Sequence, residues 1–164
     1  MNNLIRLIDG EPRCVADDPW TFLREVTGEL PCGQLILSLP VWLSADDGRA
    51  HGVWLAPEDD VESLAAHLHR LPLIAIDFPS FRDGRGYSLA YLLRSRLGWR
   101  GELRAVGDVL RDQLSHMRQC GFDAFAVRED KSVEDALKGL AGLSVLYGRS
   151  VIEPRPLFRR RTTG

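Results

Sequence analysis

The chain has 164 residues, 45% of them hydrophobic, and a formal net charge of -2 at pH 7, so its length suits one domain with a proper core and is short for two. The near-neutral charge argues against nucleic acid as a partner, because binding a phosphate backbone would require a dominant basic surface. A membrane-spanning segment is not expected either, because no apolar run approaches the roughly 20 residues that cross a bilayer.

Residues 1–33 predict an N-terminal arm or hairpin packed on the main domain. Leu4 to Ile8 has the apolar content of a strand, and the letters D-G-E-P at residues 9–12 are a turn signal. The apolar residues 20–23 follow an Asp-Pro pair, which favours the start of a short helix. Charge interrupts the first apolar residues almost at once, so we expect no signal peptide and a cytoplasmic location.

Residues 34–150 predict one α/β domain, because apolar runs alternate with segments of helical period. We expect a mainly parallel sheet of about five strands built from βα units. The five expected strands are Leu35 to Leu39, Gly52 to Leu55, Leu73 to Ile76, Leu103 to Val106 and Ala124 to Val127. An open sheet is the favoured arrangement, and a partial βα barrel is the alternative.

Four segments of this domain have helical period. They begin near Asp59, Gly86, Asp108 and Ser132, and the first ends at Pro72. Residues 151–164 have too little apolar surface to bury, so we expect them to form a mobile tail.

The loops that follow the strands carry the candidate site. In a parallel sheet the carboxyl ends of the strands meet at one edge, so these loops converge. Arginine forks, a tyrosine hydroxyl and free N–H groups there would bind or dock a small oxyanion. The candidate anion-binding or docking residues are Arg82, Asp83, Arg85, Gly86, Tyr87, Ser88 and Arg111, with Arg128 and Glu129 joining from the fifth strand.

Two carboxylates at the same edge, Asp77 and Asp108, are the candidates for a general base. The alternative interpretation is structural: Asp108 caps a helix, Asp77 pairs with an arginine, and the arginines form a solvated rim. Both interpretations stay open on the sequence alone.

No metal or cofactor site is identified in the sequence. Cys14, Cys32 and Cys120 stand far apart and form no C-x-x-C motif, which argues against a dithiol centre, a zinc knuckle or an iron–sulfur cluster supplied by this chain alone. The histidines show no metal-ligand spacing. The letters G-R-G at residues 84–86 lack the third glycine of a dinucleotide-binding loop, so any cofactor stays unknown.

Four ordered motifs resemble one bacterial family. They are Val53 to Asp60, Ile74 to Ser88, Gly101 to Leu114 and Cys120 to Phe125, and the resemblance covers roughly residues 34–145. That family has no known function, and its members are often labelled as oxidoreductases involved in sulfite reduction because they tend to be encoded beside assimilatory sulfite reductase. The resemblance implies sulfate assimilation as the pathway and sulfite reductase as a partner.

Three functions follow from these observations. The leading one, which the resemblance implies, is an accessory protein of assimilatory sulfite or sulfate reduction, including an oxidoreductase component acting with sulfite reductase. The second is a small α/β enzyme acting on an anionic substrate. The third is a non-catalytic interaction module that uses Trp42, Trp54 and Trp99 with neighbouring arginines. Whether the protein is an enzyme stays open, because arginines and carboxylates serve all three.

Overall fold

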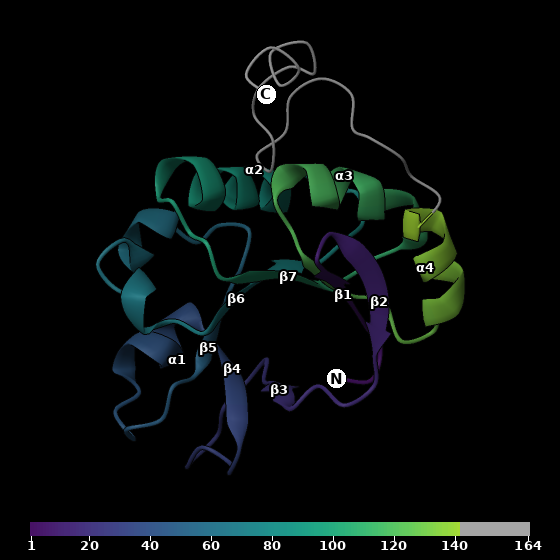
Figure 1. The fold of residues 1–164 in the computed structure, drawn as a ribbon. Helices are drawn as coiled ribbons and strands as arrows, with labels where there is room; N and C mark the ends of the chain where they lie inside the picture. Colours follow the sequence, from purple (N-terminus) through teal and green to yellow (C-terminus); the bar gives the residue numbers. More distant parts are fainter. Residues whose placement is uncertain (142–164) are drawn as a thin grey trace.

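Eight strands form one mixed, mostly parallel sheet in residues 1–141, the part of the chain that the computed structural model describes (Figure 1). The strands are β1 (Leu4–Ile8), β2 (Glu11–Val15), β3 (Trp20–Phe22), β4 (Gln34–Ser38), β5 (Gly52–Leu55), β6 (Leu73–Phe78), β7 (Glu102–Gly107) and β8 (Ala124–Ala126). Their order across the sheet is β2-β1-β8-β7-β6-β5-β4-β3.

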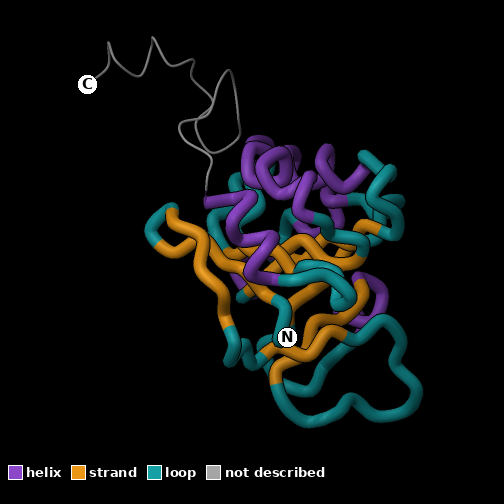
Figure 2. Tube along the Cα trace, turned by 90° about the vertical axis from the view of Figure 1, so that its right-hand side faces the viewer, coloured by secondary structure: helices purple, strands orange, loops and turns teal. Residues whose placement is uncertain are grey.

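The sheet curls strongly into a half-barrel. Strands β3 to β8 are parallel, and each one lies beside the next in the chain. Figure 1 shows α2, α3 and α4 outside the curve, and in Figure 2 most of the helical residues lie on one side of the strands. The expectation of an open sheet with about five strands was wrong, and the partial barrel describes the fold better. Because the strand order never reverses, the helices do not cover both faces and the sheet curls around its other face.

The four α-helices of the described residues are short. They are α1 (Leu39–Ser44), α2 (Arg85–Tyr91), α3 (Leu114–Cys120) and α4 (Val133–Ala141). A π-helical turn, η3 (Leu92–Arg96), continues α2, and a 3-10 turn, η4 (Arg111–Gln113), precedes α3. None of the helices in residues 1–141 is long and apolar enough to cross a membrane.

The helix expected from Asp59 to Pro72 forms two 3-10 turns instead, η1 (Val61–Leu64) and η2 (Leu68–Arg70). The Asp60 carboxylate accepts a hydrogen bond from the Glu62 backbone N–H, and the Ser63 hydroxyl donates to the Asp60 carbonyl. Local side-chain bonds of this kind compete with the α-helical pattern.

The first 22 residues contribute strands to both ends of the sheet. Strand β1 pairs antiparallel with β2 and with β8, whereas β3 pairs in parallel with β4. The apolar residues after Pro19 therefore form a strand and not the expected helix. The Met1 nitrogen donates to the Trp20 carbonyl at 3.3 Å, which connects the start of β1 with β3 across the concave side. The expected mobile tail, residues 151–164, lies outside the described residues.

Buried side chains form a layer on each face of the sheet. In β6, Ile74, Ile76 and Phe78 pack toward the helices, whereas Leu73 and Ala75 belong to a smaller apolar cluster on the concave face. All six residues of β6 are buried, which explains its unbroken apolar run.

The concave face also holds buried charges. Arg104 of β7 is fully buried, and its guanidinium contacts the carboxylates of Asp18 at 2.9 Å and Glu102 at 2.7 Å. Arg6 of β1 adds a second contact to Asp18 at 3.2 Å. This ion-pair network lies inside the half-barrel near the amino end of β7.

Candidate functional site

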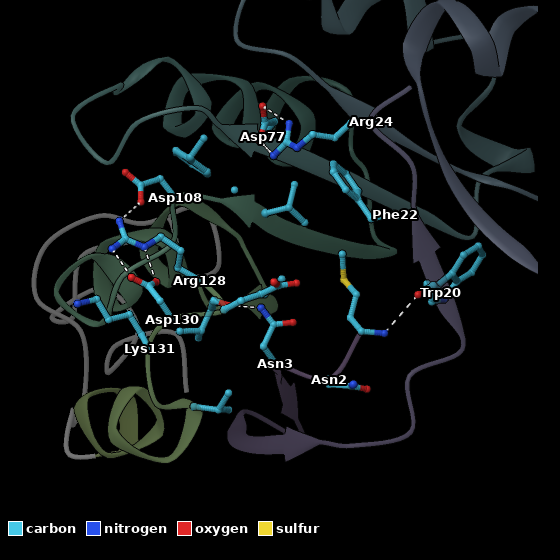
Figure 3. Close-up of a pocket in the computed structure, with 18 of the residues that line it drawn as sticks. Asn2, Asn3, Trp20, Phe22, Arg24, Asp77, Asp108, Arg128, Asp130 and Lys131 are labelled. Atoms are coloured by element: carbon cyan, nitrogen blue, oxygen red, sulfur yellow. Dashed lines mark hydrogen bonds and ion pairs between the residues drawn. The ribbon is translucent and has the colours of Figure 1, made fainter. Parts of the chain in front are cut away.

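A cleft of about 1520 Å³ opens at the carboxyl ends of β6, β7 and β8 (Figure 3). Residues of β3 and of the segment before β1 complete its wall. In barrels of βα units, this end of the strands carries the active site, so the cleft is the candidate site by analogy of fold. Its charged side chains are Arg24, Asp77, Asp108, Arg128, Glu129, Asp130 and Lys131.

Asp77 lies in the cleft wall near the end of β6 and binds Arg24. The two Arg24 terminal nitrogens donate to the two Asp77 oxygens at 3.1 and 2.9 Å, which is a bidentate pair. The Asp77 side chain is 7% exposed and that of Arg24 is 51% exposed. The hydrogen bond and charge of Asp77 raise the pKa of Arg24 further above its ordinary value, against the effect of burial.

Gly107, the last residue of β7, gives Asp77 its room. Its φ of +94° is a left-handed conformation, and a Cβ there would lie 2.5 Å from both Asp77 Oδ1 and the Phe78 carbonyl oxygen. Glycine is therefore required where β7 ends beside Asp77.

Arg128 lies after β8 and forms a second charged group in the cleft with Asp108 and Asp130. Its Nη1 donates to Asp108 Oδ1 at 2.7 Å, while its Nε and Nη2 donate to the two Asp130 oxygens at 2.6 and 2.8 Å. The other Asp108 oxygen accepts from the Phe81 backbone N–H at 2.7 Å. Figure 3 shows this group and the Arg24–Asp77 pair lining the same cleft.

These hydrogen bonds shift the ionisation of all three groups. The hydrogen bonds from Arg128 lower the pKa of Asp108 and bring the pKa of Asp130 to about 2. The hydrogen bonds to Asp130 and Asp108 raise the pKa of Arg128 above its ordinary value. All three groups are therefore charged at neutral pH.

The two candidate general bases, Asp77 and Asp108, both line the cleft. Each has both carboxylate oxygens engaged, the first by Arg24 and the second by Arg128 and a backbone N–H. A role as general base stays a prediction for both, because each carboxylate already accepts hydrogen bonds at both oxygens.

The candidate anion-binding residues do not converge on this cleft. None of Arg82, Asp83, Arg85, Gly86, Tyr87, Ser88 and Arg111 lines it. Arg85 pairs with Asp83 at 2.7 Å on the surface, and Arg111 pairs with Asp135 of α4 at 2.9 Å. The guanidinium of Arg82 lies 5.5 Å above the ring of Phe81.

Residues 86–88 belong to α2, where Gly86 is buried, Tyr87 is half-buried and Ser88 is exposed. Gly86 packs against Phe78, because an added Cβ would come within 2.6 Å of that ring. The Tyr87 ring lies 5.2 Å from the Phe78 ring and 4.4 Å from the His116 ring. Gly86 and Tyr87 therefore pack within the helical layer, none of the three residues lines the cleft, and their binding of an anion stays a prediction.

Arg24, Asp130 and Lys131 are the charged cleft residues that sequence reasoning missed. Asp130 had a usable signal, since it stands two residues after Arg128 in the loop that follows the fifth predicted strand. Arg24 had none, because it lies in the N-terminal region and meets Asp77 only through the curl of the sheet.

The described residues contain no group of three or more histidine, cysteine, aspartate or glutamate side chains placed to hold a metal ion. Cys120 has its sulfur 3.9 Å from His116 Nε2, and burial raises the pKa of its thiol. A raised thiol pKa lowers reactivity, so Cys120 is a poor nucleophile here.

Together, the fold and the cleft define an α/β half-barrel protein with a charged cleft at the carboxyl ends of its strands. The chain belongs to the family described as bacterial protein of unknown function (DUF934), whose model matches residues 52–158. Strands β5 to β8, with Asp77, Asp108 and Arg128, lie inside this match, whereas Arg24 precedes it. No curated protein and no solved structure matches the chain.

Proposed function

We propose that the protein works in the bacterial cytoplasm as an accessory protein of assimilatory sulfite reduction and binds a small oxyanion in the cleft at Arg128. The pathway and sulfite reductase as partner are supported by the four motifs that resemble proteins encoded beside that enzyme. The oxyanion is supported by the geometry of the cleft.

The contact between Arg128 and Asp130 carries this proposal. The Asp130 carboxylate occupies two donors of the guanidinium, Nε and Nη2, at 2.6 and 2.8 Å. A planar guanidinium presents the same pair of donors to sulfite, sulfate or phosphate. The Asp130 oxygens therefore mark the positions that two oxygens of a bound oxyanion would take.

Asp130 is the exchangeable partner of Arg128. Its side chain is 59% exposed, whereas that of Asp108 is 17% exposed and is also held by the Phe81 backbone N–H. Exposed ion pairs contribute little to stability, so a ligand can replace Asp130 without disturbing the fold. Lys131 lines the same cleft and adds a positive charge near the exchanged position.

Isothermal titration of the purified protein with sulfite and sulfate tests this site. We expect binding that weakens with added salt, and Arg128→Gln should abolish it because the amide offers no charged fork. Arg100→Gln is the matched control, since Arg100 is an exposed arginine outside the cleft, and this variant should bind as the parent does. Unchanged binding by Arg128→Gln would rule out this site.

Growth on sulfate as the sole sulfur source tests the pathway. A deletion strain should grow poorly on sulfate and recover with cysteine, and the Arg100→Gln gene should complement it where the Arg128→Gln gene does not. Normal growth of a deletion strain that has no second copy would contradict the proposed pathway.

A further inference from the structure

We propose that Asp77, Phe22 and Trp54 form a binding subsite for an organic cation, a guanidinium or ammonium group, and that Arg24 of the same chain occupies it in the structure. This cation subsite is separate from Arg128, so the proposal holds whether or not the cleft binds an oxyanion.

Three strands supply the walls of the cation subsite. Asp77 belongs to β6, Phe22 to β3 and Trp54 to β5, and the two aromatic ring centroids lie 5.5 Å apart. The Trp54 indole N–H donates to the Leu23 carbonyl at 2.9 Å, which fixes the ring. The walls are therefore part of the sheet.

The chemistry of these walls selects an organic cation. The guanidinium carbon of Arg24 lies 5.1 Å from the centre of the Phe22 ring and 5.8 Å from that of Trp54, while its nitrogens bind both Asp77 oxygens. Aromatic faces attract guanidinium and ammonium groups, and a carboxylate accepts the guanidinium fork. A hard metal ion would instead require several oxygen ligands, and the described residues offer no such group.

Arg24 differs from the walls because it can leave. Its side chain is 51% exposed, against 7% for Asp77, and no helix or strand is present between Phe22 and Gln34. A buried carboxylate left without a partner is unfavourable, so Asp77 will exchange one cation for another and will not stay empty. Arg24 and Asp77 both line the cleft, which can hold the rest of an incoming ligand.

Removal of Arg24 should open the cation subsite to an added guanidinium. The probe is Nα-acetylarginine amide, titrated by calorimetry into the parent, Arg24→Ala, and the double variant Arg24→Ala with Asp77→Asn. We expect Arg24→Ala to bind the probe at least about tenfold more tightly than the parent, and the double variant to lose that gain. The uncharged analogue Nα-acetylcitrulline amide should bind none of the three.

Arg70→Ala is the matched control. The Arg70 guanidinium lies 5.1 Å above the Trp42 ring, and its hydrogen-bond partner within the described part of the chain is His67 Nδ1 at 3.2 Å, not a carboxylate. Its removal should create no binding of the probe. A folded Arg24→Ala that binds the probe no better than the parent, or a double variant that binds as well as Arg24→Ala, would overturn the proposal.

A measurement on the parent protein covers the case in which Arg24→Ala does not fold. The Nε–H signal of Arg24 in a nitrogen-15 NMR spectrum should shift progressively as the probe displaces it from Asp77, and the citrulline analogue should not shift it. An Arg24 signal that stays unchanged up to high millimolar concentrations of the probe would overturn the proposal independently.

Discussion

Arg104 and Asp18 meet inside the half-barrel through two hydrogen bonds of 2.9 Å, and neither side chain reaches solvent. Asp18 lies in the connection between β2 and β3, whereas Arg104 lies on β7. The pair therefore fixes this connection against the concave face of the sheet. Since the interior screens charge poorly, each partner depends on the other for its stability.

Asp18→Asn should lower the free energy of unfolding by about 3–5 kcal/mol, because it leaves the Arg104 guanidinium buried with less compensating charge. Urea denaturation followed by tryptophan fluorescence measures this change. Glu11→Gln is the control, since Glu11 pairs with Arg13 on the surface and its loss should change stability by less than about 1 kcal/mol. Equal effects of the two changes would contradict the assigned role of Asp18.

The same residue predicts a pH dependence. Burial raises the pKa of Asp18, but the hydrogen bonds and charge of Arg104 lower it by more. The pKa of Asp18 in the folded protein therefore lies below its ordinary value. A lowered folded-state pKa means that the stabilisation is complete above the ordinary aspartate range and is lost as the pH falls through the folded-state value. The difference in unfolding free energy between the parent and Asp18→Asn should therefore be full at about pH 7 and smaller at about pH 3. A difference that grows on acidification would show that the sign is wrong.

Gly107→Ala should destabilise the protein and disturb the Arg24–Asp77 pair. The new Cβ would meet Asp77 Oδ1 and the Phe78 carbonyl, each at 2.5 Å, in a left-handed backbone conformation. Backbone strain of this kind costs about 1–3 kcal/mol. Thermal melting should show the loss, and Gly84→Ala should not, because a Cβ at Gly84 meets nothing within 4 Å.

Arg94→Met should lower stability by at least about 2 kcal/mol, because three backbone carbonyls lose their charged donor. Arg94 donates to the carbonyls of Gly121, Trp99 and Gly101 at 2.9, 2.9 and 2.8 Å. Chemical denaturation measures the change, with Arg100→Met as the exposed control. A stable Arg94→Met would show that water replaces the guanidinium at these carbonyls.

The double change Arg82→Gln with Arg85→Gln should leave the melting temperature and sulfite binding unchanged. Neither arginine lines the cleft, and Arg85 pairs only with the nearby Asp83 among the described residues. Comparison with Arg128→Gln in the same titration decides which arginines serve the oxyanion. If Arg82→Gln with Arg85→Gln abolished sulfite binding and Arg128→Gln did not, the oxyanion site would lie at the start of α2 and not in the cleft.

The central strands were predictable because their residues are buried on both faces. The expected strands at Leu73 and Leu103 appear as β6 and β7, which begin at Leu73 and Glu102. The outer strands carry no such signal. In β2, three of the five residues are exposed and two are half-buried, so neighbouring strands decide their conformation.

The site was predictable only in part for a related reason. The positions of Asp77 and Asp108 were predictable because both residues lie at strand ends, and the apolar runs in the sequence locate those ends. The direction of Arg85 and Arg111 depends on their surface partners, Asp83 and Asp135, and no spacing rule gives those pairs. Arg24 reaches Asp77 only because the sheet curls, which is a property of the whole strand order.

The antiparallel pairing of β1 with β8 has a consequence for folding. Leu4 pairs with Ala126, so two strands 122 positions apart in sequence lie side by side. Contacts between such distant residues require a large loop to close and slow the folding reaction. During synthesis the β1–β2 hairpin leaves the ribosome before the other strands of the sheet, but its sheet neighbour β8 emerges only after β7 and α3. We therefore expect docking of this hairpin onto β8 to be a late event. The edge of the sheet that is synthesised first is then the edge that is completed last.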